Sequence, residues 1–236
     1  MPGKADLNDY ARHYVGVGSE VYEKAREKLG RDVEQLRLSV DVSIIRKNLR
    51  PGDVLDFPVG QARIFDALKT NHSMWAYDVS PYFIEMVQER YPDMADRCAI
   101  CSLEEPVLDR TFDNIVTMRV LDRVADLDTV IGSVARLLKP DGVWIFNLAN
   151  ECLIKTELEA SIARAGLTLQ RLLPYDWLSN HPSEITAVER WFRGKLSVLR
   201  NTRILGMPIM SDAVYCRIDR MMPRKGSNMI VVRKCA

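Results

Sequence analysis

Two aspartates and a glycine stand where they could hold a nucleoside. Asp56 lies in the apolar run Val54–Phe57, and Asp78, 22 residues after it, follows the run Met74–Tyr77. In a parallel sheet, ligands bind outside the carboxyl ends of the strands, and a carboxylate at about this spacing accepts hydrogen bonds from ribose hydroxyls. Gly60 lies in the turn after the first run, where a missing side chain lets a ligand approach the backbone.

The residues around Gly60 distinguish one nucleoside from another. A dinucleotide rests its pyrophosphate on the bare backbone of a G-x-G-x-x-G turn. Here that register holds Pro58, Gly60 and Ala62, and Asp56 brings a negative charge toward the same place. The charge opposes a phosphate but suits a cationic amine. S-adenosylmethionine has a ribose, an ammonium group and a sulfonium but no phosphate, so the pattern favours it over NAD.

The elements that must position these residues alternate between strands and helices. Apolar runs and helical periodicity predict strands at Val54–Phe57, Met74–Tyr77, Cys98–Cys101, Asn114–Met118 and Val143–Leu148, with helices at Ala62–Lys69, Pro81–Arg90 and Asp128–Leu138. We expect Ser80 to cap the helix that begins at Pro81, and Lys139–Gly142 to form a turn. Strands separated by helices pair in parallel, with helices on both faces of the sheet.

The flanking segments are expected to be mostly helical. Residues 9–49 are predicted as helices that Arg50-Pro51-Gly52 ends. Beyond residue 150 the pattern predicts a helix at Glu151–Ala165, a strand at Leu167–Leu173, helices at Ser183–Leu199 and Ser211–Met222, and a closing strand at Asn228–Arg233.

Over residues 48–148 the chain resembles the class I S-adenosylmethionine-dependent methyltransferases. Residues 54–63 resemble the family's D-x-G-x-G-x-G motif, residues 111–116 its S-F-D-x-V stretch, residues 137–142 its L-K-P-G-G turn, and residues 228–234 the closing strand of small-molecule members. Pro58 and Ala62 replace two of the motif's glycines, and Leu121-Asp122-Arg123 stands where many members have L-H-H. The resemblance implies a Rossmann-like α/β fold with a seven-stranded, mostly parallel sheet. It also implies an N-terminal helical lid and a small helical insertion before the last strand.

The resemblance also assigns roles at the cofactor site. Asp56, Phe57, Pro58 and Gly60 would line the methionine end of S-adenosylmethionine. Asp78 would hold the ribose, although taken alone it could instead cap the following helix. Val79 would pack on the adenine, Ser102 and Leu103 would flank the adenine edge, and the Arg119 carbonyl would receive the ammonium group.

The N-terminal segment offers two further candidates for the cofactor. Tyr10 and Tyr14 are four residues apart and share one helix face. They could form a lid with their ring faces toward the sulfonium, a cation–π contact, or pack on neighbouring helices. Arg37 could pair with the methionine carboxylate or be a surface residue.

Catalytic candidates are fewer, because methyl transfer from a sulfonium depends mainly on alignment and exclusion of water. A general base is needed only when the acceptor arrives protonated. His181 is the best candidate base, with an exposed loop histidine as the alternative. His72, in the loop before Met74–Tyr77, is expected to be solvent-exposed. Asn147 is a catalytic candidate or a loop-capping amide, and Tyr175 either walls the acceptor pocket or packs in the core. Cys98 and Cys101 have C-x-x-C spacing, but residues three apart in a strand point to opposite faces, so we predict no metal site.

The composition fits one ordinary enzyme domain. The 236 residues are 47% hydrophobic and 28% charged, and the formal net charge is +1. We expect a single cofactor-binding domain with a lid (1–49), a Rossmann-like core (50–150) and a substrate-pocket insertion (175–222). Scattered cysteines, with no apolar segment of bilayer length and no signal pattern, predict a cytoplasmic protein without a membrane partner.

Residues 190–236 hold 11 basic and 2 acidic residues. This surplus could dock an acidic carrier protein or a second copy of the chain, or be a solvated surface. The insertion looks too small for a nucleic-acid platform, so we expect a small-molecule substrate. Three functions stay open: a small-molecule methyltransferase of biosynthetic type, a lyase or cyclase that releases methylthioadenosine as azetidine-2-carboxylate synthases do, and a non-catalytic binding protein.

Overall fold

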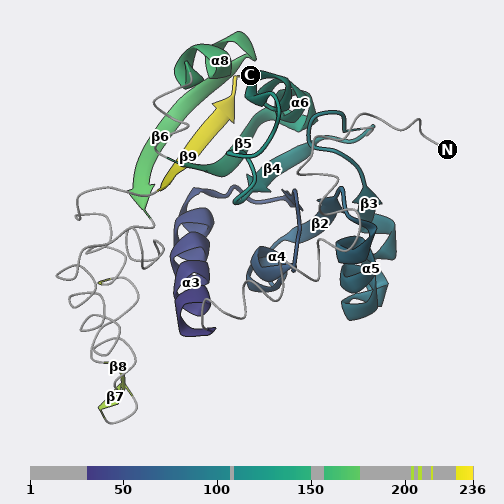
Figure 1. Cartoon of the computed structure of the whole chain (residues 1–236), viewed down its shortest axis with the longest axis vertical. Coiled ribbons are helices and arrows are strands. Elements are labelled where there is room, and N and C mark those ends of the chain that lie inside the picture. Colours follow the sequence, from purple (N-terminus) through teal and green to yellow (C-terminus); the bar gives the residue numbers. More distant parts are fainter. Residues whose placement is uncertain are drawn as a thin grey trace.

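The computed structural model describes residues 31–106, 109–149, 157–175, 203–204, 207–208, 214 and 227–235. Its centre is a seven-stranded sheet of order β3-β2-β1-β4-β5-β9-β6 (Figure 1). The strands are β1 (Asp53–Asp56), β2 (Ser73–Asp78), β3 (Cys98–Ile100), β4 (Phe112–Thr117), β5 (Leu138–Ala149), β6 (Leu167–Tyr175) and β9 (Ser227–Lys234). The first five pair in parallel, and β9 runs antiparallel to β5 and β6. The expected mostly parallel, seven-stranded sheet is confirmed.

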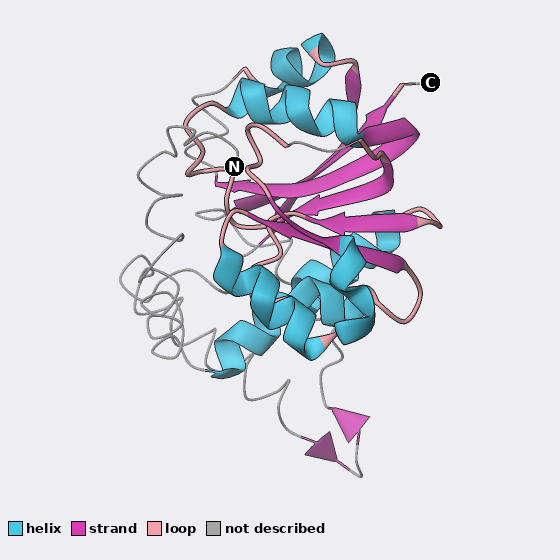
Figure 2. Cartoon of the chain, turned by 90° about the vertical axis from the view of Figure 1, so that its right-hand side faces the viewer, coloured by secondary structure: helices cyan, strands magenta, loops and turns pink. Residues whose placement is uncertain are grey.

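Two layers of helices cover the sheet, as Figure 2 shows edge-on. One layer holds α3 (Arg31–Asn48), α4 (Arg63–Leu68), α5 (Pro81–Arg90) and the 3-10 helix η1 (Pro92–Arg97), and the other holds α6 (Leu127–Leu137) and α8 (Leu158–Arg164). Each layer closes its own hydrophobic core. In β1, Val54 belongs to the core under α3 to α5, and Leu55 to the core under α6 and α8. Successive side chains of a strand point to opposite faces, so a strand buried on both faces must be apolar throughout.

Most predicted elements of the first 137 residues lie within two residues of the observed ones, and α5 matches its predicted bounds. The expected turn before β5 is wrong. The strand begins at Leu138, which already pairs with Phe112 of β4, and a register shift follows. Asp141 adopts a φ of 63° in this stretch. The Pro-Asp-Gly sequence therefore distorts the strand instead of preceding it.

Two expectations for single residues also need correction. Ser80 precedes α5, but its hydroxyl makes no capping hydrogen bond and is buried without a partner. His72, expected to be solvent-exposed, is half-buried.

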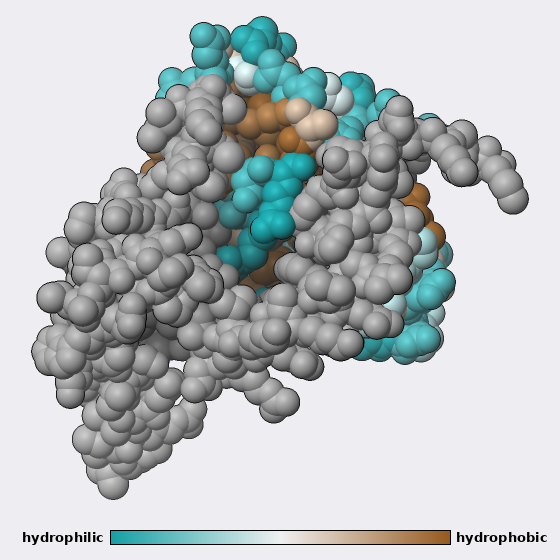
Figure 3. Space-filling model, viewed as in Figure 1, coloured by the Kyte–Doolittle hydropathy of each residue, from teal (hydrophilic) through white to brown (hydrophobic). Residues whose placement is uncertain are grey.

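Several expectations concern residues outside the described part of the chain. These are the lid over residues 1–30, the helix Ser183–Leu199 and nearly all of Ser211–Met222. The two-residue strands β7 (Arg203–Ile204) and β8 (Met207–Pro208) form a separate pair. Within the described ranges, no helix is both long and apolar enough to cross a bilayer. In the view of Figure 3, hydrophilic residues of the described surface gather at the centre and along the upper edge, with hydrophobic residues between them.

Candidate cofactor and acceptor site

Asp56 and Asp78 end two neighbouring strands at the same edge of the sheet. Asp56 of β1 pairs with Ala76 of β2, two residues before Asp78. Both carboxylates are buried, with exposed fractions of 2% and 4%. The parallel pairing thus brings together the two acids that the sequence placed 22 residues apart.

The turn after β1 is fixed by hydrogen bonds to both neighbouring strands. The Phe57 amide donates to the Val116 carbonyl of β4 at 2.9 Å, and the Val59 amide to the Tyr77 carbonyl of β2 at 2.8 Å. Gly60 follows with a φ of 47°, in the left-handed region, and an added Cβ there would meet no atom within 4 Å. Its bare backbone therefore borders open space.

Asp78 connects the loops that follow β1 and β2. One carboxylate oxygen accepts the Gly60 amide at 2.9 Å, and the other accepts the Ser80 amide at 2.9 Å. Burial raises the pKa of Asp78 to about 6, while these amides and that of Val79 lower it. The Ser80 amide precedes α5, so these bonds do not cap the helix. Asp78 also lines the cavity described below.

Asp56 is an unbalanced charge at the bottom of the site. Its Oδ2 atom is buried and has no hydrogen-bond partner. Burial, followed by the nearby Asp78, raises its pKa well above the ordinary value, although the backbone amide of Phe65 in α4 lowers it. A buried carboxylate without a counter-charge is costly, so a cationic ligand here would relieve it.

Ala62 occupies the place of a glycine in the turn. It has a φ of 56° and a ψ of 30°, and its side chain is fully buried. Its amide donates to the Val59 carbonyl at 2.9 Å. The turn thus keeps a left-handed conformation that glycine adopts most easily, even though the glycine is absent.

The loop after β3 forms a second wall. The Cys101 amide donates to the Asp78 carbonyl at 2.9 Å, which ties this loop to the end of β2. Burial, and then Asp78, raises the pKa of the Cys101 thiol to about 12. Glu104 accepts the Ala125 amide at 3.0 Å, and its own amide donates to the Ser102 hydroxyl at 3.2 Å.

Arg119, just after β4, is held from two sides. Its guanidinium donates to the Asp41 carboxylate of α3 at 2.7 Å, and the Asp41 side chain is only 5% exposed. Its backbone amide donates to the side-chain oxygen of Asn147 on β5, and its φ is 63°. Asn147 therefore fixes the loop backbone, which agrees with the loop-capping alternative.

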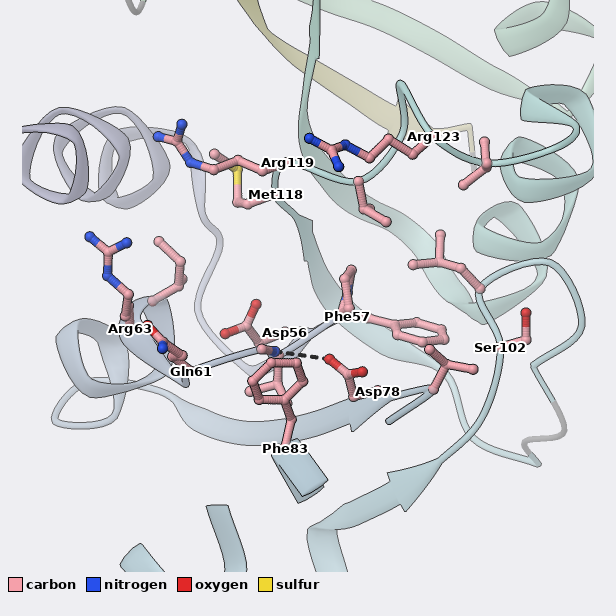
Figure 4. Close-up of a pocket in the computed structure, with 18 of the residues that line it drawn as sticks. Asp56, Phe57, Gln61, Arg63, Asp78, Phe83, Ser102, Met118, Arg119 and Arg123 are labelled. Atoms are coloured by element: carbon pink, nitrogen blue, oxygen red, sulfur yellow. Dashed lines mark hydrogen bonds between the residues drawn. The ribbon is translucent and has the colours of Figure 1, made fainter. Parts of the chain in front are cut away.

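A cavity of about 1150 Å³, part of it open to solvent, joins these walls (Figure 4). Small-molecule sites in proteins measure roughly 300–1,000 Å³. The predicted cofactor residues that line it are Asp56, Phe57, Pro58, Gly60, Asp78, Val79, Ser102, Leu103 and Arg119. Further lining residues, to which the sequence assigned no role, include Leu38, Asp41, Arg63, Met118, Val120, Arg123 and Val124.

The remaining predicted site residues have other places. Asn147 is buried at the end of β5 and does not line the cavity. Arg37 lies on α3 and Tyr175 ends β6, but their side chains are outside the described part, as are Tyr14 and His181 entirely. Within the described ranges, no group of three or more His, Cys, Asp or Glu could hold a metal ion.

Comparison with known proteins identifies the kind of domain that holds this cavity. Residues 55–146 match the family model of the Methyltransf_11 methyltransferase domain. This range runs from the C-terminal end of β1 into β5. The chain carries a methyltransferase domain over these residues. It is an enzyme of the methyltransferase type, and S-adenosylmethionine is the cofactor of this family.

Solved structures agree with the methyltransferase fold. An S-adenosylmethionine-dependent methyltransferase from Clostridium acetobutylicum ATCC 824 has a TM-score of 0.59 and 12% identity, covering 92% of this chain and 100% of that one. The [4+2]-cyclase SpnF has a TM-score of 0.55 and 15% identity, covering 83% of this chain and 80% of that one.

One curated relative is similar in sequence. The hybrid PKS-NRPS synthetase mpsA of Macrophomina phaseolina (strain MS6) is 34% identical over 113 residues, 44% of this chain. The methyltransferase chain spans only 3% of that relative's length.

Proposed function

We propose that this methyltransferase transfers a methyl group from S-adenosylmethionine to a small molecule made in a biosynthetic pathway. The observation that carries the proposal is the buried Asp56 oxygen without a partner, at the bottom of a cavity that Asp78 also lines. A cationic nucleoside would supply a positive charge and a hydrogen-bond donor for this oxygen. Its ribose hydroxyls could donate hydrogen bonds to Asp78. A dinucleotide would bring phosphates toward the same carboxylates.

The residues present fit this cofactor. Asp78 would accept the ribose hydroxyls, and Asp56 together with the Arg119 carbonyl would receive the ammonium group. Phe57, Pro58 and Gly60 would border the methionine end, and Val79, Ser102 and Leu103 would enclose the adenine. Charge-assisted hydrogen bonds to a buried carboxylate are among the stronger ones, so the two aspartates would dominate affinity.

The protein's part in the reaction is alignment and exclusion of water. The bound cofactor supplies a methyl group on a sulfonium, which is already activated for displacement. Apolar side chains of Leu38, Met118, Val120 and Val124 line the cavity beside the carboxylates. They would hold the acceptor and keep water from the reacting atoms.

Residues outside the cavity wall keep proposed roles as well. Asn147 would act as a positioning residue, because it fixes the backbone of Arg119. We retain His181 as a candidate base, Tyr175 as a pocket wall, Tyr14 as a lid residue and Arg37 as a partner of the methionine carboxylate.

The biosynthetic acceptor class is supported by the similarity to a hybrid PKS-NRPS synthetase. Such a setting also suits an acidic carrier protein docking on the basic segment 190–236. The short length of the match leaves the acceptor itself open to experiment.

Mass spectrometry tests the proposed reaction. The protein is incubated with S-adenosylmethionine, with and without a panel of small hydroxy acids, amines and β-ketoacyl thioesters. S-adenosylhomocysteine that forms only with an acceptor supports methyl transfer. Methylthioadenosine formed without an acceptor would instead identify the lyase or cyclase reaction, and bound but unconverted cofactor a binding protein. At a cofactor concentration below saturation, Asp78→Ala should lower turnover strongly, whereas Asp93→Ala, at an exposed residue of η1, should not.

A further inference from the structure

Arg119, just after β4, has a backbone conformation that residues with a side chain rarely adopt. Its φ is 63°, in the left-handed region. Such a conformation persists where the surrounding structure holds it, and it is common at binding sites. In the proposed function the Arg119 carbonyl receives the ammonium group of the cofactor. The groups that hold this backbone in place therefore also set that hydrogen bond.

Two elements hold Arg119 at different points. The side-chain oxygen of Asn147, on β5, accepts the Arg119 amide, and the Asp41 carboxylate, on α3, accepts the guanidinium at 2.7 Å. With its amide fixed, the residue can still rotate about its N–Cα bond, and that rotation moves the side chain and the carbonyl carbon together. Anchoring the far end of the side chain restrains the rotation. The bond to Asp41 therefore restricts where the carbonyl can point.

Asp41 is well placed to act as this anchor. Its side chain is only 5% exposed, and Val40, Val42 and Ile45 of the same helix are buried in the core that α3 shares with α4 and α5. The carboxylate thus belongs to a helix that packing holds in place. A buried ion pair is also screened less by water and salt than an exposed one. Figure 4 shows the Arg119 side chain extending from the loop after β4 toward α3.

We propose that Asp41 is a positioning residue for the cofactor. By holding the Arg119 side chain, it keeps the Arg119 carbonyl turned toward the ammonium group. This inference rests on the proposed function and deepens it, because it gives α3 a part in cofactor binding. Both residues line the cavity, so the test must separate positioning through Arg119 from direct contact between Asp41 and the ligand.

Two ligands that differ at the amino-acid end separate positioning from a general loss of structure. S-adenosylhomocysteine carries the ammonium group, whereas methylthioadenosine has the adenosine and the sulfur but no amino-acid end. Calorimetry measures the binding of each to the full chain. Asp41→Asn removes the negative charge with little change in size. It should weaken S-adenosylhomocysteine binding about tenfold, near the lower limit for a hydrogen bond to a charged group, and change methylthioadenosine binding less than about twofold.

Matched variants assign the effect to the ion pair. Arg119→Gln should weaken S-adenosylhomocysteine binding by a similar factor, and the double variant should lose no more than either single variant, because both changes remove the same bond. Asp128→Asn breaks an exposed pair with Arg164, also at 2.7 Å and outside the cavity lining, and should change neither affinity. If Asp41→Asn does not fold, Arg119→Gln tests the proposal with the same two ligands.

Four results would overturn the proposal. The first is unchanged S-adenosylhomocysteine affinity in the single variants, and the second is an equal loss for both ligands, which would show a purely structural role. The third is an additive loss in the double variant, which would mean that Asp41 contacts the ligand itself. The fourth is a double variant with wild-type affinity, which would assign the effect to the guanidinium charge.

The wild-type chain separates this proposal from the proposed function. If it binds neither S-adenosylhomocysteine nor methylthioadenosine, the proposed function fails and the role of Asp41 fails with it. If it binds both with equal affinity, the ammonium group contributes nothing and only the role of Asp41 fails.

Discussion

The Asp78 carboxylate accepts the backbone amide of Gly60 across 18 residues of sequence, at 2.9 Å. Through this bond the residue at the end of β2 sets the shape of the turn that follows β1. The same carboxylate faces the cavity, so the ligand-binding group and the support of the glycine turn are one residue. Changes at Asp78 should therefore affect the turn and the ligand together.

Asp78→Ala should weaken S-adenosylmethionine binding by roughly 1.5–3 kcal/mol, the usual range for a hydrogen bond to a charged group. The loss arises because the ribose hydroxyls lose their acceptor and the Gly60 amide loses its partner. Titration calorimetry measures the affinity, and Asp93→Ala serves as the control. An unchanged dissociation constant in Asp78→Ala would refute the ribose assignment.

Gly60→Ala should weaken cofactor binding more than it weakens the fold. The left-handed backbone at this position should cost about 1–2 kcal/mol with any side chain, and the new methyl group would project into open space. Gly166→Ala is a matched control, because Gly166 has a φ of 72°, equally open surroundings and a place outside the cavity lining. Both variants should lose similar stability in urea unfolding. Equal cofactor affinities of the two variants would count against a close approach at Gly60.

The stability of the cofactor-free protein should fall as the pH rises. The pKa of Asp78 is raised from 3.8 to about 6 in the folded state. A carboxyl group with a raised pKa contributes stability that is complete below its unfolded pKa and is lost as the pH passes its folded pKa. For Asp78 the loss is about 3 kcal/mol between pH 4 and pH 7, and the raised pKa of Asp56 acts in the same direction.

Urea unfolding from pH 4 to pH 8 checks this expectation, with Asp56→Asn as the comparison. That variant should be more stable than the wild type at pH 8 and should bind S-adenosylmethionine worse. Cofactor affinity of the wild type should rise as the pH passes about 6, because Asp78 then becomes charged, and the ionisation of Asp56 should add to the rise. A wild type whose stability is flat or rising over this range would contradict the burial of the two acids.

The ion pair between Asp41 and Arg119 should couple α3 to the cavity wall. A double-mutant cycle with Asp41→Asn and Arg119→Gln should give a coupling energy of about 1–3 kcal/mol in the free energy of unfolding, since Asp41 is buried. The exposed pair of Asp128 and Arg164, also at 2.7 Å, is the matched control and should give under about 1 kcal/mol. Similar coupling energies in the two pairs would show that burial adds nothing at Asp41.

The sequence predicted the sheet and most of the residues at the strand ends that line the cavity, because both depend on local patterns. Strands that are buried on both faces appear in the sequence as short apolar runs. The acidic residues at the ends of these runs can be identified from their position relative to the run. The register shift at Leu138 was missed because a Lys-Pro-Asp-Gly sequence is typical of a turn, and only pairing with Phe112 shows that the strand has begun.

The acceptor side of the cavity could not be predicted in the same way. Asp41 lies on a helix 78 residues before Arg119, and no spacing rule connects the two. Arg123 lies in the loop after β4. Charged residues are common in surface loops, so its residue type alone did not indicate a place in the cavity lining. The sequence singles out Asn147 but leaves two roles open for it. The hydrogen bond that it accepts from the Arg119 amide favours a positioning role over a catalytic one.

A crystal structure of the full chain with S-adenosylmethionine tests the central claim most directly. We predict that the cofactor lies in this cavity, with its ribose hydroxyls at hydrogen-bond distance from Asp78 and its ammonium group near Asp56. Electron density for the cofactor elsewhere, or a phosphorylated nucleotide bound against these two carboxylates in its place, would contradict it.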